Sequence, residues 1–92
     1  MNATVVSENI GMYPGDPTLY ALDTPYEGAA HVVVTRICTP CTGEDCVLRA
    51  LLVLTDEYGV MLDQSRGFLP HWQSEGAATH ADALAALGYQ IV

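Results

Sequence analysis

All three cysteines of the chain lie within nine residues, at Cys38, Cys41 and Cys46. Thiols this close together can hold a metal ion, form a disulfide or stay reduced. A zinc site normally has four tetrahedral nitrogen or sulfur ligands, and a Cys-x-x-Cys turn commonly supplies two of them. The histidines that could complete such a site are His31, His71 and His80. Zinc sites usually combine two separated ligand pairs, however, whereas this sequence offers one pair and one further cysteine.

The thiols have two other uses, a disulfide and redox chemistry. A bridge between Cys38 and Cys46 is geometrically reasonable, because both residues would lie at the mouth of one hairpin. An intracellular location argues against this bridge, since cytoplasmic thiols stay reduced. A redox role would need a helix N-terminus within a βαβ unit, which the sequence around Cys41 lacks. We therefore expect three reduced thiols and no cofactor, and a small zinc-stabilised domain is the alternative.

Three bulky side chains, Phe68, His71 and Trp72, form a second candidate site in a segment without regular periodicity. Large aromatic side chains contribute strongly to protein interfaces because they exclude water well. The competing interpretation is that Trp72 covers the open end of a small core, since tryptophan is highly buried on average. Both interpretations stay open, and these three residues are the predicted protein-binding site.

The remaining polar residues suggest no catalysis. Arg36 and Arg49 are expected on facing strands near Glu44 and Asp45. They could form an anion site, but we favour pairing with these carboxylates or coverage of apolar sheet surface by the arginine stems. The sequence has no Gly-rich phosphate loop, no Gly-x-Ser-x-Gly turn and no His-Glu-x-x-His motif. No nucleophile with an adjacent base is evident, so we predict that the protein is not an enzyme.

The charge balance restricts the partners. The formal net charge is −8, with 11 acidic residues against three arginines and no lysine. Such a surface repels nucleic acids and anionic membranes but is compatible with a basic protein partner. The acidic residues are scattered, whereas a DNA mimic would need them arrayed like a phosphate backbone. The sequence shows no signal peptide, and its longest apolar run, residues 50–54, is too short to cross a membrane, so a cytoplasmic location is predicted.

The first two thirds of the chain predict a proline-rich arm followed by a β-meander. Prolines at positions 14, 17 and 25 exclude a helix in residues 1–27 and leave room for one short edge strand over 18–22. Two β-branched or apolar runs predict strands over residues 31–38 and 47–55, joined by the cysteine loop. A four-residue turn over 56–59 leads to a third strand over 60–63, so the meander spans residues 28–63.

The last third predicts an irregular loop, a helix and a final strand. Gly67 and Pro70 interrupt the segment over residues 64–78. Thr79 followed by Asp82 is typical of a helix N-terminus, and Gly88 is typical of a helix end, so a helix is expected over 80–87. Residues 89–92 add an edge strand. The predicted fold is α+β, a single domain with an antiparallel meander of three to four strands and one short C-terminal helix packed on it.

The order of residues 20–26, 31–35, 55–59 and 79–89 resembles small uncharacterised proteins of actinobacterial phages. The resemblance covers residues 12–92, and the cysteine loop departs from it. It implies an accessory phage product that acts in the host cytoplasm by binding a host protein. The function we expect is accordingly non-enzymatic binding of a protein partner, with homodimerisation through an exposed sheet edge.

Overall fold

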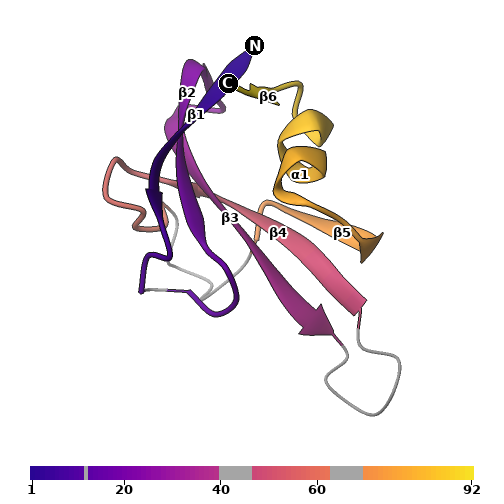
Figure 1. Cartoon of the computed structure of the whole chain (residues 1–92). Helices are drawn as coiled ribbons and strands as arrows, with labels where there is room; N and C mark the ends of the chain where they lie inside the picture. Colours follow the sequence, from indigo (N-terminus) through magenta and orange to yellow (C-terminus); the bar gives the residue numbers. More distant parts are fainter. Residues whose placement is uncertain (12, 40–46, 63–69) are drawn as a thin grey trace.

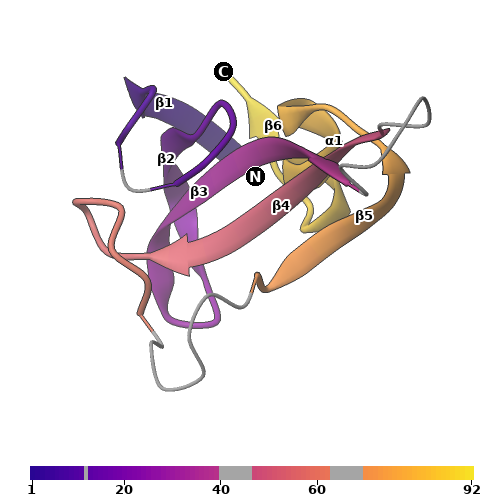
Figure 2. The same ribbon diagram turned by 90° about the horizontal axis from the view of Figure 1, so that it is seen from below.

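The protein is built on one strongly curled sheet. The computed structural model describes residues 1–11, 13–39, 47–62 and 70–92. Its elements are β1 (Asn2–Glu8), β2 (Thr18–Tyr26), β3 (Ala29–Thr39), β4 (Val47–Thr55), β5 (Trp72–Ala77), α1 (His80–Ala86) and β6 (Gln90–Ile91). The strands follow the order β5-β4-β3-β2-β1-β6 and form half of a barrel, with α1 lying against its inner side (Figures 1 and 2). The prediction of a three- or four-stranded antiparallel meander is therefore wrong.

The two strands predicted from β-branched and apolar runs form the centre of this sheet. β3 and β4 pair without interruption from His31↔Thr55 to Thr39↔Val47. The expected third strand over 60–63 is wrong, because the described part of it contributes only an isolated bridge between Met61 and Thr55. The neighbour of β4 is instead β5, which lies in the segment predicted to be irregular.

β5 pairs with β4 although its sequence lacks an alternating apolar pattern. Its register shifts between Arg49 and Leu51 of β4. At this shift the hydroxyl of Ser74 accepts a hydrogen bond of 2.9 Å from the backbone N–H of Ala50 and so replaces a backbone partner. Long-range pairing therefore outweighs the weak local preference of this segment for a strand.

The segment predicted as an arm, residues 1–27, contributes two strands. β2 is longer than the expected strand over 18–22, and it is an interior strand between β1 and β3. Pro25 lies where the pairing of β2 with β3 shifts, between Ala21 and Tyr26, so its missing N–H interrupts no regular ladder. The last strand, β6, pairs with β1 in parallel at Asn2 and Ala3, which makes the sheet mixed.

Side chains on both faces of the sheet are buried. The inner face packs against α1, and its fully buried residues include Val32, Val34 and Leu52 of the sheet and Ala83 and Leu84 of the helix. On the outer face, Thr35 is buried and donates a hydrogen bond to the carbonyl oxygen of Pro14. The phenol of Tyr13 reaches the carbonyl oxygen of Gly59 at 2.7 Å, which ties two loops together.

The start of the predicted helix is confirmed. The Thr79 hydroxyl accepts from the Asp82 N–H, and the Asp82 carboxylate accepts from the Thr79 N–H, which is a complete capping box. The predicted stop is also confirmed, since Gly88 takes a left-handed φ of 92° just after the helix. Among the described residues, no helix combines the length and the apolar character needed to cross a membrane.

Candidate functional site

The loop that precedes β2 places a carboxylate beside β3. Pairing of β2 with β3 ends at Thr18↔Val34, and Asp16 continues along β3 beyond this point. Its Oδ1 accepts a hydrogen bond of 2.7 Å from the backbone N–H of Arg36. Gly15 allows this close approach, because it has a φ of 87° and a Cβ there would overlap the carbonyl oxygen of Arg36. Backbone geometry therefore fixes the position of the carboxylate.

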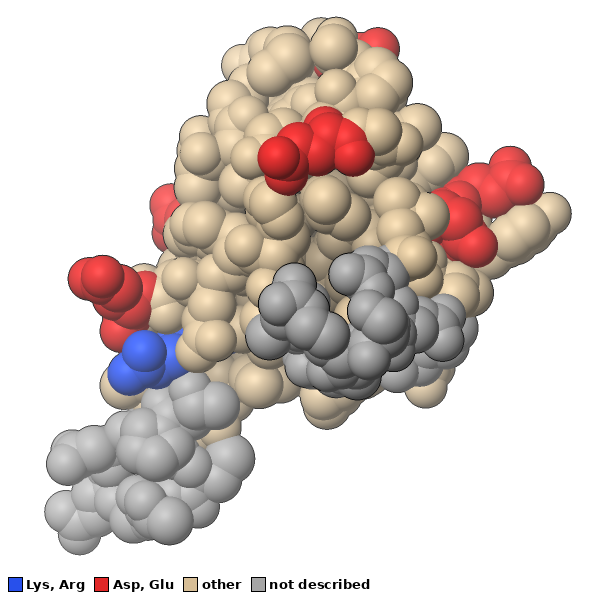
Figure 3. All heavy atoms as spheres, turned by 180° about the vertical axis from the view of Figure 1, so that it is seen from behind, with Lys and Arg blue, Asp and Glu red and all other residues tan. Residues whose placement is uncertain are grey.

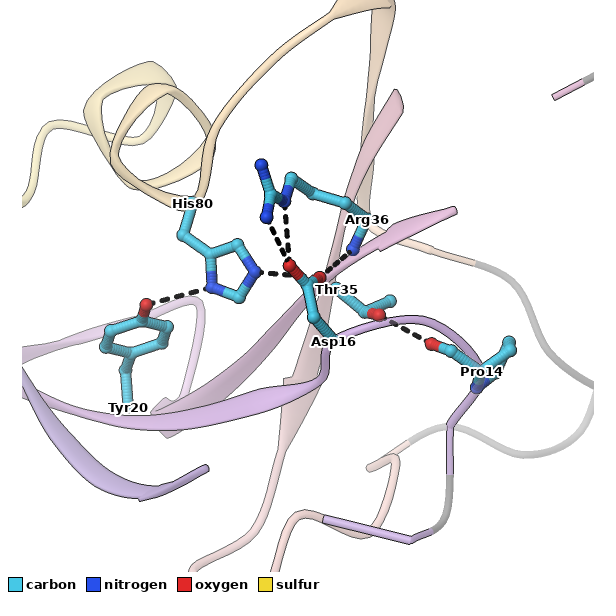
Figure 4. Close-up of polar contacts among 6 residues, drawn as sticks. All are labelled: Pro14, Asp16, Tyr20, Thr35, Arg36 and His80. Atoms are coloured by element: carbon cyan, nitrogen blue, oxygen red, sulfur yellow. Dashed lines mark hydrogen bonds and ion pairs between the residues drawn. The ribbon is translucent and has the colours of Figure 1, made fainter. Parts of the chain in front are cut away.

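The side chains of Arg36 and His80 complete the surroundings of this carboxylate (Figure 4). The Arg36 guanidinium contacts Oδ2 of Asp16 through Nε at 2.8 Å and Nη2 at 2.6 Å. Nε2 of His80, the first residue of α1, lies 3.1 Å from Oδ1. Burial raises the pKa of Asp16, but hydrogen bonds from Arg36 and His80 outweigh this effect and hold its pKa at about 2. Asp16 is therefore ionised at any physiological pH.

The imidazole of His80 connects this ion pair to a phenol on β2. Nδ1 of His80 lies 3.0 Å from the hydroxyl of Tyr20, and the two rings meet edge to face with centroids 6.1 Å apart. Burial raises the pKa of Tyr20, and the negative charges of Glu8 and Asp16 raise it further. The phenol of Tyr20 therefore stays protonated at neutral pH.

These residues line an open cavity of about 330 Å³. Its walls come from the end of β1, the loop before β2, β2 itself, β3 and the start of α1: Glu8, Asn9, Asp16, Thr18, Tyr20, Arg36 and His80. The lining is polar, and it contains two carboxylates against one guanidinium and one imidazole. Such a cavity can bind a polar group by hydrogen bonds and charge.

The predicted thiol site lies mostly outside the described residues. Cys41 and Cys46 belong to the part that the structure does not describe. Cys38 lies near the C-terminal end of β3 and is disulfide-bonded, so the expectation of three reduced thiols is wrong. The structure does not describe the partner of Cys38, and the bridge between Cys38 and Cys46 stays a prediction. His31 lies in β3, where it pairs with Ala21 and Thr55. Within the described ranges, no group of three or more metal-ligating side chains comes together.

The structure describes two members of the predicted aromatic site, His71 and Trp72, and gives them different surroundings. Trp72 is only partly exposed and packs against the inner core, as the competing interpretation expected. His71 contacts the ring of Tyr26 edge to face, with centroids 5.2 Å apart, and its Nε2 lies 3.4 Å from a carboxylate oxygen of Glu27. Phe68 lies outside the described residues. A binding role for Phe68, His71 and Trp72 stays a prediction.

The two arginines differ from each other in their surroundings. Arg36 pairs with Asp16, a residue that the sequence analysis did not select, while Glu44 and Asp45 lie outside the described residues. Nε of Arg49 is buried without a hydrogen-bond partner in the described part of the chain. The sequence analysis also missed Tyr20 as a site residue. The only local sign was the Pro-Gly-Asp-Pro turn, which indicates a tight loop but not its destination.

An apolar, open strand edge lies next to the cavity. Large exposed apolar side chains of the described residues concentrate on β1, β6 and their ends: Met1, Val5, Val6, Ile91 and Val92. β6 covers the outer edge of β1 only at Asn2 and Ala3, and no described residue pairs with β1 on that side farther along. Val5 lies opposite Tyr20 and Glu8 lies opposite Thr18, so the uncovered part of β1 borders the cavity.

Comparison of the chain with models of protein families, with curated proteins and with solved structures finds no match. The resemblance to actinobacterial phage proteins and the cytoplasmic location therefore stay predictions. What can be said of the protein's activity rests on the geometry of the β1 edge and the adjoining cavity.

Proposed function

We propose that this protein is a non-enzymatic binding module that takes up an extended segment of a protein partner as an additional strand along β1. The observation that carries this proposal is the outer edge of β1, with which no described residue pairs beyond Ala3, together with its exposed apolar side chains, Val5 and Val6. Strand addition supplies affinity through backbone hydrogen bonds, and alternate side chains supply specificity.

The backbone of β1 has the hydrogen-bonding groups that such an added strand requires. The carbonyl oxygens of Met1 and Ala3 accept hydrogen bonds from the N–H groups of Gln90 and Val92. Because backbone groups of alternate residues point to the same side of a strand, those of Val5 point outward beyond β6. After Val5, the pairing of β1 with β2 shifts its register before Ser7. This shift changes the direction of the β1 edge locally.

The opposite edge of the sheet is less suited to this role. β5 exposes mainly small or polar side chains, including Gln73, Glu75 and Gly76. Charged side chains protect strand edges from pairing, and β1 carries a single charge, at Glu8, the last residue of the strand.

The surface charge favours a basic partner over a second copy of this chain, since each copy has a net charge of −8. Figure 3 shows the acidic groups spread over one face rather than gathered into a phosphate-like row.

A display library of random linear peptides tests the proposal. Peptides selected on the wild-type protein are expected to slow hydrogen exchange at the backbone N–H of Val5, and the Val6→Lys variant is expected to lose this binding. Leu48→Lys is the matched control, because Leu48 is also an exposed apolar strand residue but lies on β4. Selected peptides that protect amides elsewhere and bind Val6→Lys equally well would overturn the proposal. If the wild-type protein forms a stable dimer and Val6→Lys dissociates it, the partner that binds along β1 would be a second copy of this chain rather than another protein.

A further inference from the structure

We infer that the polar cavity at the end of β1 receives a basic side chain, a lysine or an arginine, from the segment bound along β1. This inference rests on the proposed function and names the feature that the site recognises. The cavity and the strand edge share one residue, because Glu8 belongs to β1 and also lines the cavity. A strand added beside Val5 therefore passes the mouth of the cavity with alternate side chains on its inner side.

The charges in the cavity favour a cation. Asp16 is engaged by Arg36 and His80, whereas no cation among the described residues pairs with the Glu8 carboxylate. The Glu8 charge also acts on the cavity itself, since it contributes to the raised pKa of Tyr20. With His neutral, the two carboxylates and one guanidinium leave the lining with an excess of negative charge.

The same contacts disfavour an anionic ligand. The lining has one guanidinium, and its Nε and Nη2 both already bind Oδ2 of Asp16. A phosphate or carboxylate would have to compete with this built-in carboxylate and would approach Glu8 at the same time. Like charges this close repel each other, so the arrangement selects against anions.

The size and the acceptors of the cavity also suit a long basic side chain. Its volume of about 330 Å³ is near the lower end of the range of small-ligand pockets, about 300–1,000 Å³, and leaves room for one long side chain. Thr18 and Asn9 belong to the lining, and their side chains carry oxygens of a kind that accepts hydrogen bonds from an ammonium or guanidinium group. A lysine or arginine could extend its apolar stem past Val5 and place its charged end beside Glu8.

The experiment compares peptides selected from the same display library on the wild-type protein and on the Glu8→Gln variant. Wild-type selection is expected to enrich lysine or arginine at one fixed peptide position, and Glu8→Gln selection is expected to lose this enrichment while peptides still protect Val5. The matched control is Glu75→Gln, because Glu75 is an exposed carboxylate on β5, at the opposite edge of the sheet. This control is expected to keep the enrichment.

Measured affinities then test directly whether the Glu8 carboxylate interacts with the basic residue of the peptide. Glu8→Gln is expected to weaken the binding of a selected lysine peptide by about 1.5-fold to fivefold, as for exposed ion pairs. The same peptide with norleucine in place of lysine should bind wild type and Glu8→Gln equally. Two results would overturn this inference and leave the proposed function intact. In the first, the selected peptides protect Val5 but show no preference for a basic residue. In the second, Glu8→Gln changes the affinity of the lysine peptide and of the norleucine peptide by the same factor. Failure of every peptide to protect Val5 would overturn the proposed function itself.

Discussion

The ionised carboxylate of Asp16 is expected to stabilise the fold in a way that depends on pH. One pKa unit corresponds to about 1.4 kcal/mol, so lowering the pKa of Asp16 from 3.8 to about 2 corresponds to roughly 2.5 kcal/mol. The Asp16 side chain is 38% exposed, and solvent screening reduces this value to about 1 kcal/mol. The Asp16→Asn variant should therefore be about 1 kcal/mol less stable than wild type near neutral pH.

The sign of the pH dependence follows from the lowered pKa. A carboxyl group whose pKa is lower in the folded protein stabilises the fold above its ordinary pKa, and this stabilisation is lost as the pH falls through the folded value. For Asp16 the loss extends from about pH 4 to about pH 2. The stability difference between wild type and Asp16→Asn should consequently fall by about half between about pH 6 and about pH 3.

Urea unfolding followed by the fluorescence of Trp72, the single tryptophan, measures this difference. Trp72 is partly buried against the core, so its emission should change on unfolding. Glu57→Gln serves as the control, because Glu57 is an exposed carboxylate in the turn after β4 and should not change the pH dependence of stability. If Asp16→Asn lowers the free energy of unfolding by the same amount at about pH 6 and at about pH 3, the reasoning is refuted. The effect would then come from shape and hydrogen bonding rather than from charge.

Two further substitutions test the contacts that hold the loops and the helix on the sheet. Gly15→Ala should destabilise the protein by about 2 kcal/mol or more, because its Cβ would overlap backbone of β3 at a left-handed φ, whereas Gly76→Ala, with open space around it, should change the melting temperature little. Tyr89→Phe removes a hydrogen bond of 2.6 Å to the carbonyl oxygen of Thr24 and should lower stability by about 1 kcal/mol in urea unfolding, while Tyr58→Phe, at a residue 72% exposed, should have no measurable effect. Equal effects of the two glycine variants, or of the two tyrosine variants, would contradict these assignments.

Elements with a strong local pattern were predictable from the sequence, and those made by long-range pairing were not. The β-branched run that forms β3 and the capping box at Thr79 both specify their structure within a few residues. β5 contains Gln73, Glu75 and Gly76, and it becomes a strand only because β4 offers it an edge. β1 is likewise mixed in polarity, and its position depends on β2 and β6.

The candidate site was unpredictable for the same reason. Asp16 and His80 are 64 positions apart, and Tyr20 and His80 are 60 apart, so no local spacing relates them. The sequence analysis considered His80 only as a zinc ligand and placed Tyr20 only within a short edge strand over residues 18–22. Both expectations followed from the local sequence, whereas the actual contact follows from the curl of the sheet, which brings the start of α1 to β2.

The pairing of β6 with β1 has a consequence for the order of folding. A hydrogen bond between Gln90 and Asn2 joins side chains 88 positions apart, so closing this contact early would carry the loop-closure entropy of nearly the whole chain, and we expect it to form late. β6 has only two residues in the sheet and both are exposed, which makes it the element expected to detach most easily. Its detachment would uncover Asn2 and Ala3 as well and would extend the open edge of β1 to the start of the strand.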